Sequence, residues 1–311
     1  MAFFALFAQV FTISTGIAPS QFLGVFKKLW FTVDVSKGKT YRGFYSSATV
    51  LTCYFGAFYQ LARRSGYFNI NYLFSVMAAC LLCVVLSATR GWLLGFSLGL
   101  ILYLVLVLRL SIKRLATVVG TGAVMVAALM LLPVVKTQFD NAFKRFTTLE
   151  KLASGDVTAG GTLSRINERS PRVLDKWSEA PFTGWGFSDA FFKHGDFHVG
   201  NQNILLHAGI IGAILMGFFI IFFHWALLAR SLQLHRGNPY KAPLLVFVVF
   251  FPGWFLIHSS SGQHFAFYSD PANSIVLTYY LTLGALTYRL SFNPKPQAAD
   301  ASIHPPDEAE V

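Results

Sequence analysis

Residues 203–229 read NILLHAGIIGAILMGFFIIFFHWALLA and contain no Asp, Glu, Lys or Arg. An apolar run of this length is typical of a helix that crosses a lipid bilayer. The rest of the chain has the same character: of its 311 residues 54% are hydrophobic, 16% are aromatic and only 13% are charged, with a mean hydropathy of +0.53. A soluble domain carries about twice that share of charge, so the composition favours a membrane protein.

Further apolar segments predict seven further spans, five of them clear and two weaker, the weaker ones at the amino terminus and near the carboxyl terminus. We therefore expect an all-α, polytopic bundle of about eight transmembrane helices. The predicted spans are residues 1–18, 45–62, 70–88, 91–108, 115–135, 203–228, 242–258 and 272–288.

These spans divide the chain into four predicted regions. Residues 1–135 and 203–291 form two groups of transmembrane helices, 136–202 form an extracytoplasmic (periplasmic) loop, and 292–311 form a disordered cytoplasmic tail rich in proline and acid. Orientation follows from Lys and Arg, which gather in alternate connections and mark them as cytoplasmic. The basic connections contain Arg63, Arg64, Arg109, Lys113, Arg114, Arg230, Arg236, Lys241, Arg289 and Lys295. Only the short basic loop around Lys37 departs from this alternation.

The extracytoplasmic loop is predicted to fold into a small helical cap. Its first half carries apolar residues at steps of three and four, the spacing that lines one face of a helix: Phe139, Phe143, Phe146, Leu149 and Leu152. Ser170 and Pro171 then supply an N-cap and a first-turn proline for a second helix. The buried stripe of that helix is expected to contain Val173, Leu174 and Trp177.

Arginines in the cap form a first candidate anion site. Arg165, Arg169 and Arg172 gather at the start of the second cap helix, where backbone N–H groups and the helix dipole favour anions. The alternative is a solvated face on which these arginines pair with Glu168 and Asp175.

Arg90 is a second candidate. It lies in Ser87-Ala-Thr-Arg-Gly91, a tight turn between two spans on the predicted outer side. A guanidinium offers a planar fork of donors that suits a phosphate or a diphosphate. The alternative is that Arg90 only reaches out to the phosphates of the surrounding lipid.

Two spans also carry small residues at four-residue intervals, a spacing that lets helices approach closely in lipid. They are Gly91, Gly95 and Gly99 in one span, and Gly209, Ala213 and Gly217 in the other.

The sequence disfavours several other functions. The net charge of +11 is explained largely by the cytoplasmic connections, and no basic face is interleaved with stacking aromatics, so nucleic acid is not an expected partner. No Cys/His spacing resembles a zinc site and no Asp-x-Asp pair could hold a divalent ion, so we predict no metal and no other cofactor. No Gly-x-x-x-x-Gly-Lys-Ser/Thr loop supports ATP-driven transport.

The order of these features resembles the O-antigen ligase and polymerase superfamily. The elements that carry the resemblance are the Ser87–Gly91 turn, the arginines of a long outer loop, Pro181-Phe-Thr-Gly-Trp-Gly-Phe187, and a histidine ahead of Gly209-Ile-Ile-Gly212. The family's loop histidine usually stands eleven residues before the first of these glycines, which selects His198. The family's usual next residue is Asn, and this chain has Val199 there.

The same resemblance selects further residues. The family's first loop arginine lies some fifteen residues ahead of the Pro-Leu-x-Gly-x-Gly-like element, which indicates Arg165, 16 residues before Pro181, with Arg172 as the alternative. Tyr41-Arg-Gly-Phe44 resembles an Arg-x-Gly-Phe stretch that enters an earlier span in many members. Apart from the resemblance, His258 and His264 flank the last outer loop and are further candidates to line the same outward-facing site.

The resemblance implies a multi-pass enzyme of the bacterial inner membrane that transfers a glycan from undecaprenyl diphosphate on the outer side, without a metal. His198 would take the proton from the acceptor hydroxyl, while Arg90 and Arg165 hold the donor diphosphate. The expected substrate-binding residues are Arg172, Arg42, Asn203 and Arg169. The expected partners are the lipid-linked glycan, membrane lipid, and either lipid A core or a growing glycan as acceptor.

Three alternatives stay open at this point. A ligase that modifies lipid A core and a polymerase that extends a lipid-linked O-antigen or exopolysaccharide use the same donor, and we favour the ligase. A non-catalytic glycan or solute carrier would need ionisable groups buried within the spans, where His224 is almost alone. Family members usually have more spans upstream, so this chain is either a short member or one that lacks its first spans.

Overall fold

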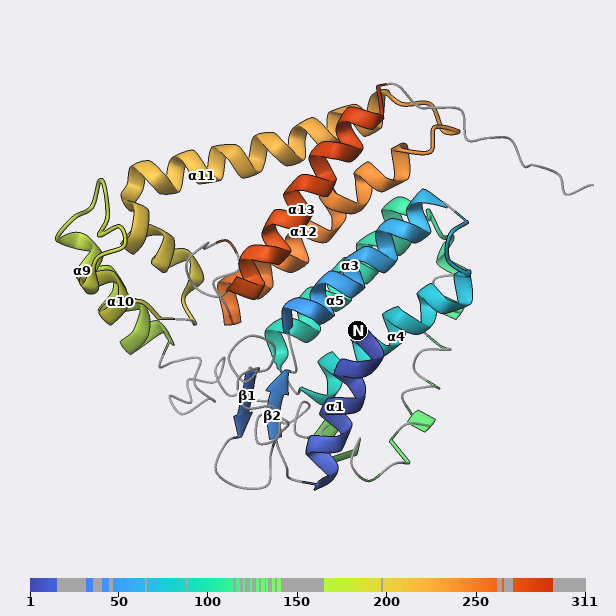
Figure 1. Ribbon diagram of the computed structural model, residues 1–311, viewed down its shortest axis with the longest axis horizontal. Coiled ribbons are helices and arrows are strands. Elements are labelled where there is room, and N and C mark those ends of the chain that lie inside the picture. Colours follow the sequence, from blue (N-terminus) through green and yellow to red (C-terminus); the bar gives the residue numbers. More distant parts are fainter. Residues whose placement is uncertain are drawn as a thin grey trace, which may run out of the picture.

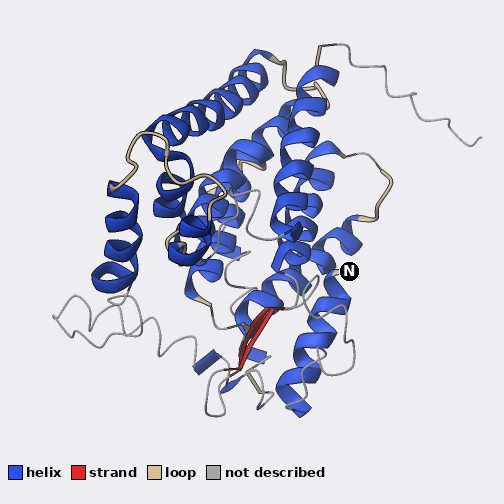
Figure 2. Ribbon diagram, turned by 60° about the vertical axis from the view of Figure 1, so that its left-hand side comes forward, coloured by secondary structure: helices blue, strands red, loops and turns tan. Residues whose placement is uncertain are grey.

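The computed structural model describes residues 1–15, 32–35, 41–44, 47–64, 66–87, 89–113, 165–196, 198–261, 265 and 271–292, with scattered positions between 116 and 140. Most of the predicted first cap helix and the 293–311 tail lie outside the described residues. The described segments are helical, as predicted, apart from one short hairpin (Figure 2).

A bundle of helices forms the centre of the molecule (Figure 1). It consists of α3 (Ser47–Arg63), α5 (Arg90–Leu102) with its continuation in the π-helix η3 (Tyr103–Val107), α12 (Lys241–Ser261) and α13 (Pro271–Leu290). Helices α1 (Ala2–Thr15) and α4 (Ile70–Leu86) pack along one side of it.

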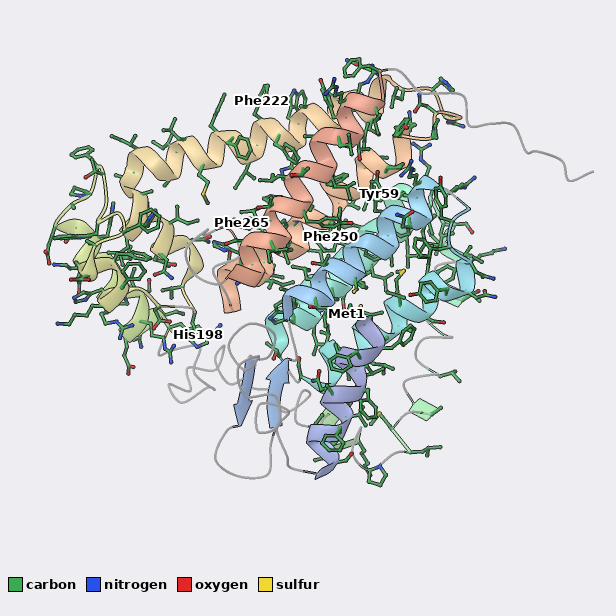
Figure 3. All side chains as sticks on the ribbon, in the orientation of Figure 1. Met1, Tyr59, His198, Phe222, Phe250 and Phe265 are labelled. Atoms are coloured by element: carbon green, nitrogen blue, oxygen red, sulfur yellow. The ribbon has the colours of Figure 1, made fainter. Side chains whose placement is uncertain are left out.

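Aromatic side chains fill the core of this bundle. The Tyr54 ring stacks on Phe96 with 4.4 Å between centroids and donates its hydroxyl to the Phe96 carbonyl at 3.0 Å. Phe250, labelled in Figure 3, packs edge-on against Phe55 at 4.9 Å. Offset and edge-to-face pairs of this kind contribute about 0.5–1.5 kcal/mol each beyond their burial. The core therefore joins α3, α5, α12 and α13 into one unit.

Helices α5 and α12 approach each other backbone to backbone. A Cβ atom added at Gly95 would lie 2.6 Å from the carbonyl oxygen of Gly253 and 2.6 Å from Ile257, so only glycine fits there. The small-residue prediction is confirmed at this position. Gly99, one turn further along α5, lies near Phe250, one turn earlier in α12, so the two helices run antiparallel. The Arg90 end of α5 therefore lies at the Ser259 end of α12.

Helix α11 (Gly200–Gln233) is broken at Gly209, whose backbone has φ 63° and ψ −171°. The segment after the break runs along the top of Figure 1 against α12 and exposes apolar side chains on its outer side, Phe222 among them (Figure 3). Phe218, Ile221 and Trp225 are also exposed. A helix with this apolar, outward-facing surface is suited to contact with lipid.

Two described helices are long and apolar enough to cross a bilayer, Gly200–Gln233 and Lys241–Ser259. Shorter apolar helices cover Ala2–Phe11, Ile70–Leu86 and Gly91–Val107. Helices lie at every predicted span except 115–135, most of which lies outside the described residues. The prediction of eight spans is not confirmed, because most of these helices are too short or too polar to pass for a full span.

One short hairpin accompanies the helices of the predicted all-α fold. Strands β1 (Thr32–Val35) and β2 (Tyr41–Phe44) pair in antiparallel register, with Asp34 opposite Arg42 (Figure 2). Thr32, Val33 and Val35 are β-branched, which favours an extended backbone.

Candidate active site

A small helical cap stands beside the bundle (Figure 1). It is formed by the π-helix η4 (Arg165–Arg169), α9 (Ser170–Ser178), α10 (Asp189–His194) and the first part of α11. Its own core contains Val173, Phe191, Val199 and Leu206, all 4% exposed or less, with Trp177 packed against them. The prediction of a second cap helix with a buried Val173 is confirmed.

The start of that helix differs from the prediction. Arg169 already has helical backbone angles, with φ −76° and ψ −46°, so η4 continues directly into α9. Ser170 is therefore the first residue of α9 and not its N-cap, and Pro171 lies in the first turn as expected. Arg165, Arg169 and Arg172 lie along one continuous helical segment, and not beside a separate helix start.

Asp196 joins two of these arginines. Its carboxylate lies 3.3 Å from Nη1 of Arg169 and 2.9 Å from Nη2 of Arg172. The Asp196 side chain is only 10% exposed, while those of Arg169 and Arg172 are 38% and 53% exposed. The two guanidinium groups are thus anchored from the inside and keep N–H groups that face solvent.

The same aspartate fixes the turn that carries His198. The backbone N–H of His198 donates to Oδ1 of Asp196 at 2.9 Å. Asn203 holds the backbone of Asp196 from the other side: its Oδ1 accepts from the Asp196 N–H at 3.0 Å, and its Nδ2 donates to the Asp196 carbonyl. One carboxylate therefore holds two arginines and the histidine turn together.

Asn203 has a different role from the one expected. It is fully buried and both ends of its amide are engaged by Asp196, so in this structure it positions the aspartate and does not face an open site. Arg165 is half-buried at the start of η4. For Arg42 and Arg90 only the backbone is described, in β2 and at the first residue of α5.

The Pro181–Phe187 loop docks into the break of α11. Backbone N–H groups of Trp185 and Gly186 donate to the carbonyls of Leu206 and His207 at 2.8 Å. In the other direction, Ile210 donates to the Pro181 carbonyl at 2.9 Å, and Ile211 donates to Phe182 at 3.2 Å. These bonds replace the helical bonds that the break removes.

Two glycines make this docking possible. Gly184 and Gly209 both have positive φ, 65° and 63°. A Cβ on Gly184 would lie 2.5 Å from the carbonyl oxygen of His207, and one on Gly209 would overlap the backbone of Phe182. The spacing had suggested that Gly209 packs one helix against another, whereas it serves the contact between the cap loop and α11.

A hydrogen bond ties the cap to the bundle. Asn201 Nδ2 donates to Ser259 Oγ at 3.1 Å, which brings the start of α11 to the end of α12. Because α5 runs antiparallel to α12, the backbone of Arg90 lies at this same end of the bundle.

Two further histidines were candidates for this site. His258 is fully buried and its Nδ1 accepts the backbone N–H of Phe265 at 3.3 Å, so it packs in the core and does not line an open substrate site. His264 lies outside the described residues.

Sequence reasoning missed Asp196. It had suggested Glu168 and Asp175 as partners of the cap arginines, but in the described part of the chain Arg169 and Arg172 pair with Asp196 alone. The available signal was the spacing Asp196-x-His198, which places a carboxylate two residues before the selected histidine. An aspartate accepts readily from the backbone N–H two residues on.

The O-antigen ligase family model matches residues 75–213. This match confirms the resemblance to the O-antigen ligase and polymerase superfamily. The matched O-antigen ligase segment begins in α4, contains Arg90 and the cap, and ends just after the break in α11. Members of this family are integral membrane proteins of bacteria that act on glycans. Neither the curated proteins nor the solved structures gave a match.

Proposed function

We propose that this protein transfers a glycan from undecaprenyl diphosphate to an acceptor hydroxyl on the extracytoplasmic side of the bacterial inner membrane. The observation that supports this most directly is the cluster around Asp196, in which one carboxylate anchors Arg169, Arg172 and the backbone of His198. The turn that carries His198 is thereby held next to two arginines that could bind an anion.

Charge supports a diphosphate as the ligand. Arg169 and Arg172 share one carboxylate, so one positive charge of the pair is uncompensated, and Arg165 lies on the same helical segment. Each guanidinium has five N–H donors, and Asp196 engages only part of them. The outward donors suit the paired oxygens of a diphosphate.

The proposed reaction breaks the bond between the sugar's anomeric carbon and the diphosphate oxygen. The acceptor oxygen forms a new bond to that carbon and releases its proton to His198, because imidazole accepts protons near neutral pH. Negative charge develops on the departing diphosphate, where Arg90 and Arg165 as catalytic groups, and Arg169, Arg172 and Arg42 as binding groups, would stabilise it. No divalent ion enters this scheme.

We favour an O-antigen ligase, with lipid A core as acceptor, over a polymerase, because the matched family model carries the ligase description. Both reactions use the same donor, and the cap chemistry described above serves either. In this proposal the 136–202 segment is the extracytoplasmic domain, and the two groups of helices on either side of it are the membrane domains.

The test is glycan transfer in a deletion strain complemented with single variants, normalised to the protein found in the membrane. His198→Ala, Arg172→Ala, Arg165→Ala and Arg90→Ala should each reduce transfer, on the order of 100- to 1000-fold where a charge-stabilising donor is lost. Arg172→Lys should also fail largely, because an ammonium keeps the charge but lacks the planar fork.

A matched control lies in the same cap. Lys193→Ala removes an exposed positive charge in α10 that takes no part in the Asp196 cluster, and it should leave transfer within about twofold of normal. If the four test variants accumulate normally and still support near-full transfer, the catalytic assignment is wrong and a glycan carrier becomes the better account.

Asp196→Asn separates positioning from direct participation. The change removes the anchor of Arg169 and Arg172 and weakens the hold on the His198 turn, so transfer should fall at least tenfold although Asp196 touches no substrate in this scheme. The apparent affinity for the lipid-linked donor should weaken as well, because both arginines lose their fixed position. Asp175→Asn, an exposed aspartate of α9 outside the cluster, is the control.

A further inference from the structure

A second cluster of cations lines a cleft of about 370 Å³ at the opposite end of the bundle. The cleft lies between the ends of α3 and η3, the α11–α12 connection and the start of α12. Its basic residues are Arg63, Arg64, Arg109, Arg236 and Lys241, and the described residues of its lining include no Asp or Glu. Helix α12 has Lys241 in this cleft and Ser259 beside the cap, which separates the two places by roughly 27 Å at 1.5 Å per residue.

The arginines of this cleft have no acidic partner in the part of the chain that the structure describes. All ion pairs found among the described residues lie in the cap, and none involves Arg63, Arg64, Arg109 or Arg236. Lys241 donates only to the neutral carbonyl of Leu234, at 2.5 Å. Like charges around one cavity repel one another, so an anion that enters the cleft is stabilised by all of them.

Backbone conformation also sets two of these arginines apart. Arg64 and Arg109 have φ angles of 51° and 50°, the only positive values found among the described non-glycine residues. Each follows the end of a helix, the position at which glycine is normally favoured because it adopts this conformation without strain. An arginine at both positions is unfavourable for the backbone, and both side chains line the cleft.

The chemistry of the lining indicates the class of ligand. Leu106, Val107 and Leu245 supply apolar wall beside the guanidinium groups, so the cleft suits a phosphate that is attached to something apolar. The cleft lies at the side that Lys and Arg predict to be cytoplasmic, where anionic lipids attract basic groups at the membrane surface. We propose that this cleft binds the phosphate of an anionic phospholipid from the cytoplasmic leaflet. The proposal does not depend on glycan transfer at the cap.

The test is lipid binding by the full-length protein in detergent, followed by native mass spectrometry during titration with phosphatidylglycerol, with phosphatidylcholine as the neutral comparison. The unaltered protein should prefer phosphatidylglycerol. Arg64→Gln together with Arg236→Gln should weaken that binding roughly 25-fold, or about fivefold for each charge removed at the membrane surface. Arg289→Gln together with Lys193→Gln removes the same charge outside the cleft and should change binding by less than about twofold.

The other outcomes overturn the proposal. An equal loss in both double variants would mean that net charge alone attracts the lipid, and no loss in the cleft variant would mean that the lipid binds elsewhere. Inorganic phosphate at millimolar concentration that displaces the lipid completely would identify a free-anion site. If the double variant does not fold, as judged by size-exclusion chromatography, Arg236→Gln alone provides the test, because this exposed residue lies in a connection and outside the packed helices.

Discussion

Gly209→Ala should detach the cap loop from α11 and leave the bundle folded. The angles of Gly209, φ 63° and ψ −171°, lie in a region that only glycine adopts readily, so alanine there costs on the order of 1–3 kcal/mol. The added Cβ would also overlap the backbone of Phe182 and push the loop away. That movement breaks up to four backbone hydrogen bonds, each worth about 0.5–1.5 kcal/mol. Together with the backbone strain, the lost bonds bring the total cost of the substitution to roughly 3–9 kcal/mol.

This penalty is comparable with what holds the cap together. The cap core contains four buried apolar side chains, each contributing about 1.5–3 kcal/mol. The bundle has a separate and larger core, so it should not respond. We therefore expect loss of transfer with normal accumulation in the membrane.

Hydrogen exchange of the purified protein measures the effect directly. The amides of Trp185, Gly186, Ile210 and Ile211 should lose protection in Gly209→Ala, while amides of α3 and α12 keep theirs. Gly217→Ala is the matched control, because this glycine lies in the same helix with no atom within 4 Å of an added Cβ. If the two variants show the same protection and the same transfer, the docking of the loop does not depend on Gly209, and our account of the α11 break fails.

Gly95→Ala should lower the free energy of unfolding of the detergent-solubilised protein by about 1–3 kcal/mol, and its melting temperature with it, because the added Cβ would lie 2.6 Å from the Gly253 carbonyl oxygen. Gly99→Ala, whose nearest contact is 3.8 Å away, should have little effect, and equal melting temperatures would contradict the close crossing of α5 and α12. For topology, cysteine at the exposed Ser178 should react with an impermeant thiol reagent in intact spheroplasts, and cysteine at Gln233 should react only after the membrane is opened; the reverse pattern would invert the orientation. Transfer by the purified protein should survive excess EDTA, and activity that disappears and returns with magnesium or manganese would refute a mechanism based on arginines.

Local signals in the sequence predicted much of the fold. The apolar run after Asn203 and the stripe containing Val173 and Trp177 depend on residues close together in the chain, and the helices that they predicted are present. Gly95 was identified in the same way, because close helix packing needs a small residue at the crossing point. Helix length was less predictable, since an apolar composition does not fix where each helix ends.

The candidate site depends on contacts that spacing does not show. Asp196 lies 24 and 27 residues from its arginine partners, and only the folding of the cap around Val173 brings them together. A positive φ at Gly209 likewise leaves no trace in sequence periodicity, so this glycine looks the same as one that packs against a neighbouring helix. The N-cap predicted at Ser170 is also absent, because the helical backbone of η4 continues into α9 and makes Ser170 a residue within the helix.

The break at Gly209 bears on how the protein is assembled during synthesis. From Ile210 to Ala229 the chain has no Lys, Arg, Asp or Glu, so the insertion machinery can release this stretch into lipid as one segment. The residues just before it, Gly200–Ala208, form a separate short helix that is bonded to the cap. In the proposed topology, the depth at which Ile210 enters the bilayer would therefore set the height of His198 above the membrane. Lengthening or shortening the apolar segment by one turn would shift the histidine by about 5 Å along the membrane normal, relative to any lipid-linked substrate whose own diphosphate is held at the headgroup level.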